Sequence, residues 1–246
     1  MVHHQFADAT LAALYDAFCP WDQRQDFAFY LPLVMAADSV LDVGCGTGAL
    51  LHRARDTGHT GRLRGLDPAP GMLAQAQRRA DIDWTLGDLA SVPLDERFDL
   101  VLMTGHAFQV LVDDAELRTA LTAIRSALTD HGRFAFETRN PTVREWEQWT
   151  SDRATEATDA AGTVVRMDNQ IDTPIVGDRV RFTTTYRSPR WDQPQLSHST
   201  LRFLDAPDLA RFLTDAGLIV DEQFGDWDRS ALTETSPEII TISRRA

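Results

Sequence analysis

The segment Ser39–Leu50, SVLDVGCGTGAL, constrains the fold of this chain more than any other part of the sequence. An apolar run that contains Asp42 is followed by Gly44, Gly46 and Gly48 at alternate positions, and then by a helix-favouring stretch. Glycine tolerates positive φ and has no Cβ, so a ligand can lie against the main chain. The amides of a following helix favour a negative ligand group, whereas Asp42 supplies a negative charge beside them. The segment therefore predicts a strand, a binding loop and a helix that hold a ligand of mixed charge.

The composition limits the class of protein. The chain has 246 residues, of which 43% are hydrophobic and 25% charged, which predicts a folded protein with one sizeable core. The longest uncharged apolar run, residues 31–37, is too short to span a bilayer, and the N-terminus lacks a signal-peptide pattern. We therefore expect a cytoplasmic protein without a membrane partner. The net charge of -13 argues against nucleic acid as a partner, because it repels phosphate backbones.

Neither the two cysteines nor the seven histidines suggest a metal site or a disulfide framework. We therefore predict no metal. Cys19 and Cys45 are interpreted as small buried hydrophobic residues.

From Ser39 onward, apolar strands alternate with amphipathic helices, which predicts an α/β fold with a doubly wound, mostly parallel seven-stranded sheet. The last two strands, LIVDEQF and EIITISRR, are predicted to pair as a hairpin. Before this core, helical spacing of apolar residues predicts helices over residues 8–18 and 22–35, with Pro32 expected to kink or break the second.

Residues 143–204 interrupt the alternation. A helical piece rich in Trp and Glu is followed by three β-rich runs, and Gly177-Asp178 between the first two is a hairpin signal. We interpret this region as an inserted antiparallel flap. The chain is thus predicted to be a single domain, residues 1–246, with a helical cap (1–37), a Rossmann-like core (38–142 and 205–246) and the flap (143–204).

The spacing of the glycines separates the candidate ligands. A dinucleotide fingerprint is G-x-G-x-x-G, whereas this chain has G-x-G-x-G with an acid two positions upstream. That acid, Asp42, would repel a pyrophosphate but suits a cationic sulfonium or ammonium group.

Four motifs in order resemble the cofactor motifs of class I S-adenosylmethionine-dependent methyltransferases. They are DVGCGTG at 42–48, LDPAPGML at 66–73, GDLASVPL at 87–94 and FDLVLMTGHAF at 98–108. The C-terminal GDWDRS and SPEIITISRR also resemble the ends of small-molecule members, such as natural-product enzymes and amino-sugar N-methyltransferases. The resemblance covers residues 8–246, most strongly through 141, and implies S-adenosylmethionine as the cofactor and S-adenosylhomocysteine as its product.

The resemblance gives each motif position a role. Asp42 would lie close to the ammonium group of the cofactor, Asp67 would accept hydrogen bonds from both ribose hydroxyls, and Asp88 would accept one from the adenine amino group. Asp67 also fits a helix cap, and Met72 also fits the core, so these alternatives stay open. The cofactor-binding residues implied are Tyr15, Tyr30, Asp42, Gly44, Cys45, Gly46, Gly48, Asp67, Pro68, Met72, Gly87, Asp88, Leu89, Thr104 and Gly105.

His106 follows the fourth strand of the predicted sheet, at the edge where open α/β folds bind ligands. An imidazole there is the candidate catalytic base, although it would equally position the substrate or pack. Methyl transfer needs alignment more than acid-base assistance. The candidate substrate-binding residues at this edge are Gln109, Arg139, Asn140 and Trp227. A surface salt bridge is the alternative for Arg139, and packing is the alternative for Trp227.

The predicted function is methyl transfer from S-adenosylmethionine to an N or O atom of a small molecule. One alternative is a catalytically silent S-adenosylmethionine-binding partner or sensor. A nicotinamide-dependent reductase is disfavoured by the glycine spacing and by the lack of a Tyr-x-x-x-Lys pair around the three tyrosines. The sequence predicts neither the acceptor molecule nor the oligomeric state.

Overall fold

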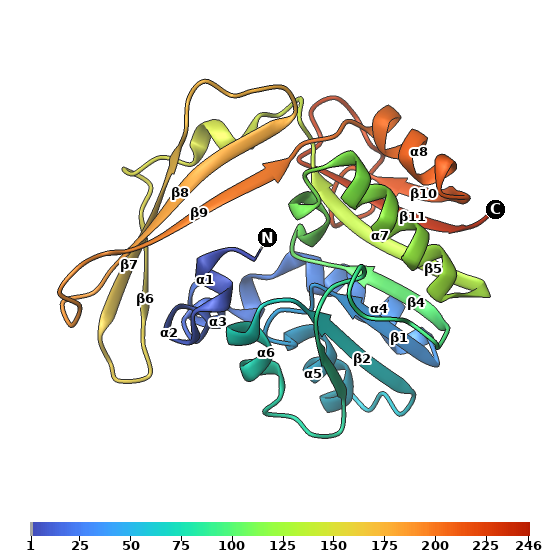
Figure 1. Ribbon diagram of the computed structural model, residues 1–246, viewed down its shortest axis with the longest axis horizontal. Helices are drawn as coiled ribbons and strands as arrows, with labels where there is room; N and C mark the ends of the chain where they lie inside the picture. Colours follow the sequence, from blue (N-terminus) through green and yellow to red (C-terminus); the bar gives the residue numbers. More distant parts are fainter. Residues whose placement is uncertain (1) are drawn as a thin grey trace.

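The computed structural model describes residues 2–246 and places them in a seven-stranded sheet flanked by helices, with a separate four-stranded sheet to one side (Figure 1). The strand order is β10-β11-β5-β4-β1-β2-β3. The strands from β1 to β5 pair in parallel, whereas β11 is antiparallel to both β5 and β10. The strands are β1 (Ser39–Val43), β2 (Arg62–Asp67), β3 (Asp83–Leu86), β4 (Phe98–Met103), β5 (Leu128–Arg139), β10 (Leu218–Phe224) and β11 (Glu238–Arg245). The predicted fold class and the predicted C-terminal hairpin are confirmed.

The sheet has a core on each face because successive side chains of a strand point to opposite sides. In β1, Val40 packs in one cluster with α4 and α5, whereas its neighbour Leu41 packs in a second cluster with α7 and α8. Such burial on both faces is typical of doubly wound sheets. The helices of the core are α4 (Gln25–Ala36), α5 (Ala49–Asp56), α6 (Pro70–Ala76), α7 (Asp114–Ala127) and α8 (Ala206–Asp215). No helix within residues 2–246 is long and apolar enough to cross a bilayer.

The N-terminal cap differs from its prediction. Instead of one helix over residues 8–18, the structure has three single-turn helices, α1 (His4–Ala7), α2 (Ala9–Ala12) and α3 (Tyr15–Phe18), followed by η1 (Trp21–Gln23). Asp8 starts the second helix, since its carboxylate accepts hydrogen bonds from the Thr10 and Leu11 amides. Of the kink or break predicted at Pro32, the break does not occur, because α4 continues through this residue.

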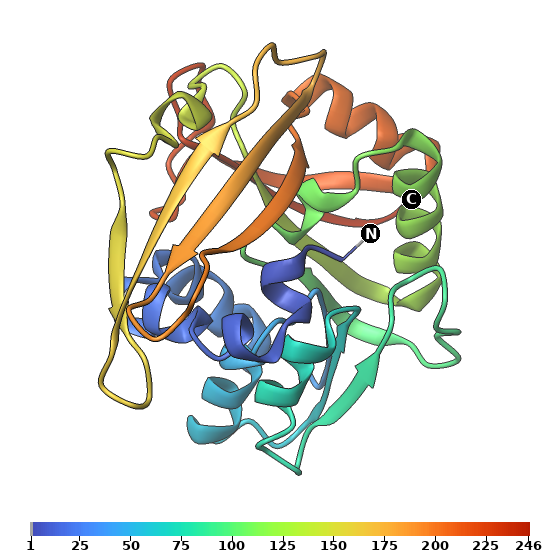
Figure 2. The same cartoon turned by 60° about the vertical axis from the view of Figure 1, so that its left-hand side comes forward.

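The inserted segment forms an antiparallel sheet in the order β6-β7-β8-β9, as predicted. Its strands are β6 (Thr155–Thr158), β7 (Val164–Ile171), β8 (Arg179–Arg187) and β9 (Gln195–Arg202), preceded by η3 (Glu145–Gln148). Gly177 and Asp178 form the turn between Val176 and Arg179, which pair as an isolated bridge, and Gly177 has a φ of 62°. The sheet curves over the N-terminal helices rather than over the main sheet (Figure 2). The cap therefore lies between the two sheets.

Candidate functional site

The glycine loop follows β1 at the carboxyl edge of the main sheet. Gly44, Gly46 and Gly48 have φ values of 73°, 57° and 74°, which other residues rarely adopt. The Gly44 amide donates to the Leu66 carbonyl oxygen at 2.7 Å. A Cβ on Gly46 would meet nothing within 4 Å, so this part of the loop faces open space.

We expect Gly44→Ala to destabilise the protein more than Gly58→Ala. Both positions have positive φ, but a Cβ on Gly44 would lie 2.8 Å from the Ala107 Cβ, whereas a Cβ on Gly58 would meet nothing within 4 Å. The left-handed backbone alone costs about 1–2 kcal/mol, and the clash adds to that cost only at Gly44. Urea unfolding of both variants measures the difference. Equal losses in the free energy of unfolding would show that Ala107 moves aside at no cost.

Asp67 ties the loop to the next strand. Its Oδ2 accepts a hydrogen bond from the Gly46 amide at 2.7 Å, and its Oδ1 accepts one from the Ala69 amide at 2.8 Å. Burial raises the pKa of Asp67, and these two amide bonds oppose that effect. Each carboxylate oxygen has a second lone pair, which leaves it able to accept a ligand hydroxyl. The helix-cap alternative is not met, because Ala69 is itself the N-cap residue of α6 and this helix has no side-chain cap.

Asp42 is a buried carboxylate that lacks a partner for one oxygen. Asp42 is 1% exposed. Within the described part of the chain, its Oδ1 has no hydrogen-bond partner. Burial, reinforced by Asp67, raises the pKa of Asp42 to about 7, and Arg24 opposes this shift. A cationic ligand group beside Oδ1 would supply the missing partner. The site thus fits the ammonium group that the sequence predicted.

Arg24 is a site residue that the sequence analysis missed. It lines a small cleft together with Asp42, Gly44 and Gly46, and it is held by two-pronged contacts to Asp26, with Nε 2.8 Å from Oδ1. A guanidinium beside a glycine loop attracts carboxylate groups. Arg24 lies near the start of the second predicted helix, residues 22–35, in a stretch with no motif spacing that could have marked it.

Two further cavities continue this cleft. We call the first the central cavity: it has a volume of about 310 Å³ and is lined by residues that include Gly44, Asp67, Thr104 and His106. The second, the outer cavity, has a volume of about 460 Å³ and includes Asp88 in its lining. The two are contiguous, because Gly44, Pro68 and Ala107 line both.

In the outer cavity, the carboxylate of Asp88 is fixed by a turn. Its Oδ1 accepts hydrogen bonds from the amides of Ala90 and Ser91 and from the Ser91 hydroxyl. These bonds, led by that of the Ser91 side chain, lower the pKa of Asp88, so it is ionised at neutral pH. A fixed acceptor in an otherwise mostly apolar cavity suits a flat heterocycle that carries an amino group.

His106 stands at the centre of a network of buried acids. Its amide donates to the Glu137 Oε1 at 2.6 Å, and its Nε2 lies 3.0 Å from the Glu238 Oε2. Tyr30 donates from its hydroxyl to the Glu137 Oε2 at 2.6 Å. His106 also has a φ of 61°, so the network holds it in a conformation that is rare for this residue.

Burial, with the nearby Arg139, lowers the pKa of His106 to about 4, and burial raises the pKa of Glu238 to about 8. Near neutral pH the pair therefore holds one proton between the imidazole and the carboxyl group, and it carries no net charge. Neither Glu137 nor Glu238 was predicted. Their only signal is that each is a single acid at the end of an apolar strand, in FAFET and in EIITI.

The structure brings most of the predicted cofactor-binding residues to these cavities, and their contacts with a cofactor stay predictions. They are Tyr15, Asp42, Gly44, Cys45, Gly46, Asp67, Pro68, Met72, Gly87, Asp88, Leu89, Thr104 and Gly105. Gly48 does not line them: a Cβ there would lie 2.4 Å from the Trp84 Cη2, so this glycine allows close packing. Tyr30 is fully buried, lines none of these cavities and donates to Glu137, so its contact with the cofactor stays a prediction.

Three predicted substrate-binding residues serve the structure. Gln109 is 1% exposed, donates to the Arg202 carbonyl oxygen and accepts from the Arg139 guanidinium. Asn140 is 5% exposed and ties its own loop to the Thr233 and Ser236 carbonyl oxygens. Trp227 packs edge-on against the Phe29 and Tyr30 rings. The side chains of Gln109, Asn140 and Trp227 are thus engaged by contacts within the protein, and their contact with a substrate stays a prediction.

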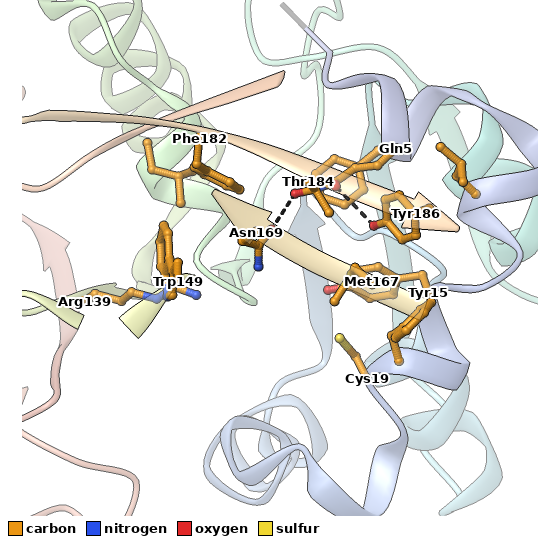
Figure 3. A pocket seen from close by; sticks show the side chains of 14 residues that line it. Gln5, Tyr15, Cys19, Arg139, Trp149, Met167, Asn169, Phe182, Thr184 and Tyr186 are labelled. Carbon is orange, nitrogen blue, oxygen red and sulfur yellow. Dashed lines mark hydrogen bonds between the residues drawn. The ribbon is translucent and has the colours of Figure 1, made fainter. Parts of the chain in front are cut away.

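Arg139 lies at the entrance to a third cavity, which we call the flap cavity (Figure 3). This cavity has a volume of about 220 Å³ and lies between the cap and the inner face of β7 and β8. Tyr15, Arg139 and Phe182 line both the flap cavity and the central cavity, so the two are neighbours. The site thus consists of a cofactor-sized groove that leads to a separate chamber under the flap.

Comparison with known proteins shows which proteins this chain is similar to. Residues 40–132 match the family model described as a methyltransferase domain. The ubiquinone biosynthesis O-methyltransferase of Methylobacterium sp. is 32% identical over 151 residues, which cover 59% of this chain and 57% of that protein. The chain spans about half the length of the curated relatives it matches.

Two solved structures share the fold over nearly the whole chain. The CcbJ methyltransferase of Streptomyces caelestis has a TM-score of 0.74 at 20% identity, with 98% of each chain covered. CalS10 of Micromonospora echinaspora, an amino pentose methyltransferase with S-adenosylmethionine bound, has a TM-score of 0.65 at 22% identity, with 90% of each chain covered.

Residues 40–132 are therefore similar to a methyltransferase domain, and the chain as a whole has the Rossmann-like fold of the solved methyltransferases. The family match and the cofactor-bound neighbour support S-adenosylmethionine as the cofactor. The resemblance predicted from the four sequence motifs is confirmed.

Proposed function

We propose that this protein transfers a methyl group from S-adenosylmethionine to an oxygen or nitrogen atom of a small molecule. The observation that carries this proposal is the unpartnered Asp42 carboxylate beside the glycine loop, at one end of a groove that passes Asp67 and Asp88. The cofactor supplies an electrophilic methyl group on a sulfonium when it is bound. Asp42 would pair with its ammonium group, Asp67 with its ribose hydroxyls and Asp88 with its adenine amino group.

The rest of the chain would orient the acceptor and exclude water. Direct displacement requires the donor, the methyl carbon and the acceptor atom to be in line. The cap and the flap enclose the flap cavity, which opens toward the central cavity at Arg139 and Phe182. A chamber of about 220 Å³ favours a small molecule over a folded macromolecule. The charge of -13 supports the same choice over nucleic acid, and we place the protein in the cytoplasm on its composition.

S-adenosylhomocysteine is expected to raise the melting temperature of the protein, whereas NADH is expected to have no effect. A ligand at 100 times its dissociation constant stabilises the folded state by about 2.7 kcal/mol. Thermal unfolding with each compound measures the shift. Absence of a shift with S-adenosylhomocysteine would contradict the cofactor assignment. Mass spectrometry of acceptor pools incubated with S-adenosylmethionine then separates an enzyme from a silent binding protein.

A further inference from the structure

We propose that the methyl acceptor is an aromatic alcohol, bound with its ring in the flap cavity and its hydroxyl group directed to Arg139 and His106. This inference rests on the proposed function and deepens it. It selects oxygen over nitrogen, and a neutral aromatic molecule over a cationic amine.

The walls of the flap cavity favour a flat apolar ring. The alternation of β8 turns Phe182, Thr184 and Tyr186 inward and leaves Thr183 and Thr185 on the other face. The inward set faces the cap, which contributes Phe18 to the lining, and Trp149 closes the end nearest Arg139. Aromatic walls bind aromatic rings with offset or edge-on geometry. Figure 3 shows these side chains around one space.

The charges of the flap cavity disfavour an ammonium group. Among the described residues that line it, Arg139 is the one ionised side chain, and no Asp or Glu contributes. Glu145, which lies 2.9 Å from the Arg139 Nε, is not a lining residue. Burial keeps Tyr15 protonated by raising its pKa to about 12. A cationic amine would therefore lose its hydration shell without gaining a counter-charge.

The polar groups that line the flap cavity also favour an oxygen atom on the ligand. The Thr184 hydroxyl donates to the Asn169 Oδ1 at 2.7 Å, which leaves the amide nitrogen of Asn169 as a donor toward the cavity (Figure 3). The Tyr186 hydroxyl is bonded to the Gln5 Oε1 at 3.2 Å. Donors from Asn169 and Arg139 complement hydroxyl or carbonyl oxygens.

The reaction itself gives His106 a role that an amine acceptor would not require. A phenolic hydroxyl loses its proton with a pKa near 10 in water, so at neutral pH it needs a base. As the hydroxyl oxygen bonds to the methyl carbon, the carbon–sulfur bond breaks with its electron pair left on sulfur, and the hydroxyl proton passes to the neutral imidazole. The His106–Glu238 pair, which is neutral near pH 7, thereby gains one positive charge. Glu238 accepts a hydrogen bond from the imidazolium Nε2, which lies 3.0 Å from its Oε2, and Arg139 stabilises the developing phenolate.

The test compares two probes of equal shape on the protein saturated with S-adenosylhomocysteine. Calorimetry at pH 7 measures binding of 2-naphthol and of 2-(aminomethyl)naphthalene, which is a cation. We expect 2-naphthol to bind at least tenfold more tightly. Equal or tighter binding of the amine, or no binding of either probe, overturns the proposal. If wild-type protein fails to bind S-adenosylhomocysteine, the proposed function fails instead, so the two failures are distinguishable.

A pair of neighbouring variants locates the site. Thr184→Trp fills the flap cavity and is expected to weaken 2-naphthol binding at least tenfold, while Thr183→Trp places the same ring on the opposite face of β8 and is expected to leave it unchanged. S-adenosylhomocysteine binding by both variants verifies that they fold. Unchanged 2-naphthol affinity in Thr184→Trp overturns the placement. Formation of 2-methoxynaphthalene from 2-naphthol and S-adenosylmethionine, and no methylated product from the amine, is the expected catalytic result.

Discussion

Replacement of Asp67 by Ala is expected to weaken S-adenosylhomocysteine binding about 30- to 150-fold, or about 2–3 kcal/mol. Asp67 is 6% exposed and lines the central cavity, so two ligand hydroxyls would share its carboxylate. The same carboxylate fixes the Gly46 and Ala69 amides, and Ala leaves both donors without their acceptor. Isothermal calorimetry of the wild type and the variant measures the difference.

A matched control separates the loss of a contact with the ligand from the loss of a carboxylate that only stabilises a turn. Asp159 also holds two amides, since its Oδ1 accepts from Ala161 and Thr163, but it lies in the turn between β6 and β7. Asp159→Ala is expected to leave S-adenosylhomocysteine affinity unchanged. Asp67→Asn, which keeps one acceptor oxygen, is expected to lie between the wild type and Asp67→Ala. If Asp67→Ala binds as tightly as the wild type, the carboxylate does not contact the ribose.

The elements that the sequence predicted well are those specified locally. The loop at Gly44 and Gly46 and the turn at Gly177 depend on backbone conformations that few other residues adopt, so their residue types reveal them. The order and pairing of the main strands follow from apolar alternation and from the short connections between them. The helix predicted over residues 8–18 begins at its predicted start, where Asp8 caps it, but it breaks between Ala12 and Tyr15, which apolar spacing does not register.

The site residues and contacts that the sequence missed depend on partners far away along the chain. Gln109 was predicted at the correct edge of the sheet, but its bond to the Arg202 carbonyl oxygen, 93 residues away, turns it into the protein. Glu238 reaches His106 across 132 residues. Such pairings arise only when β11 inserts beside β5, and no local pattern encodes the direction of a side chain at a strand end. The sequence therefore indicated the edge of the sheet at which these residues lie, but not the contacts that their side chains make within the protein.

Binding of S-adenosylhomocysteine is expected to weaken by up to about 25-fold as the pH falls from 7.5 to 5.5, because Asp42 must be ionised to pair with an ammonium group. The pKa of Asp42 in the free protein is about 7, raised by burial and by Asp67, Glu137 and Asp26, and lowered by Arg24. Below that pH the carboxyl is protonated, so binding must release a proton, and affinity loses up to a factor of ten for each pH unit. Calorimetry in two buffers of different ionisation enthalpy measures the released proton directly.

The same shift sets the sign of an effect on the ligand-free protein. A carboxyl whose pKa is higher in the folded state than in the unfolded state holds its proton more tightly when folded, so stability falls as the pH rises from about 4 through about 7.

Asp42→Asn removes the buried charge, and we expect this variant to be at least as stable as the wild type at pH 8, yet to bind S-adenosylhomocysteine more weakly there. Its affinity should also lose most of the pH dependence. A variant that keeps the full pH dependence would assign the proton to another group, with Asp67 and Glu137 as the neighbouring acids of raised pKa. The ionised Asp42 carboxylate therefore lowers the stability of the ligand-free protein, and the ammonium group of the ligand would neutralise it. This explains why, among the described residues, the Asp42 Oδ1 lacks a hydrogen-bond partner in the core of the sheet.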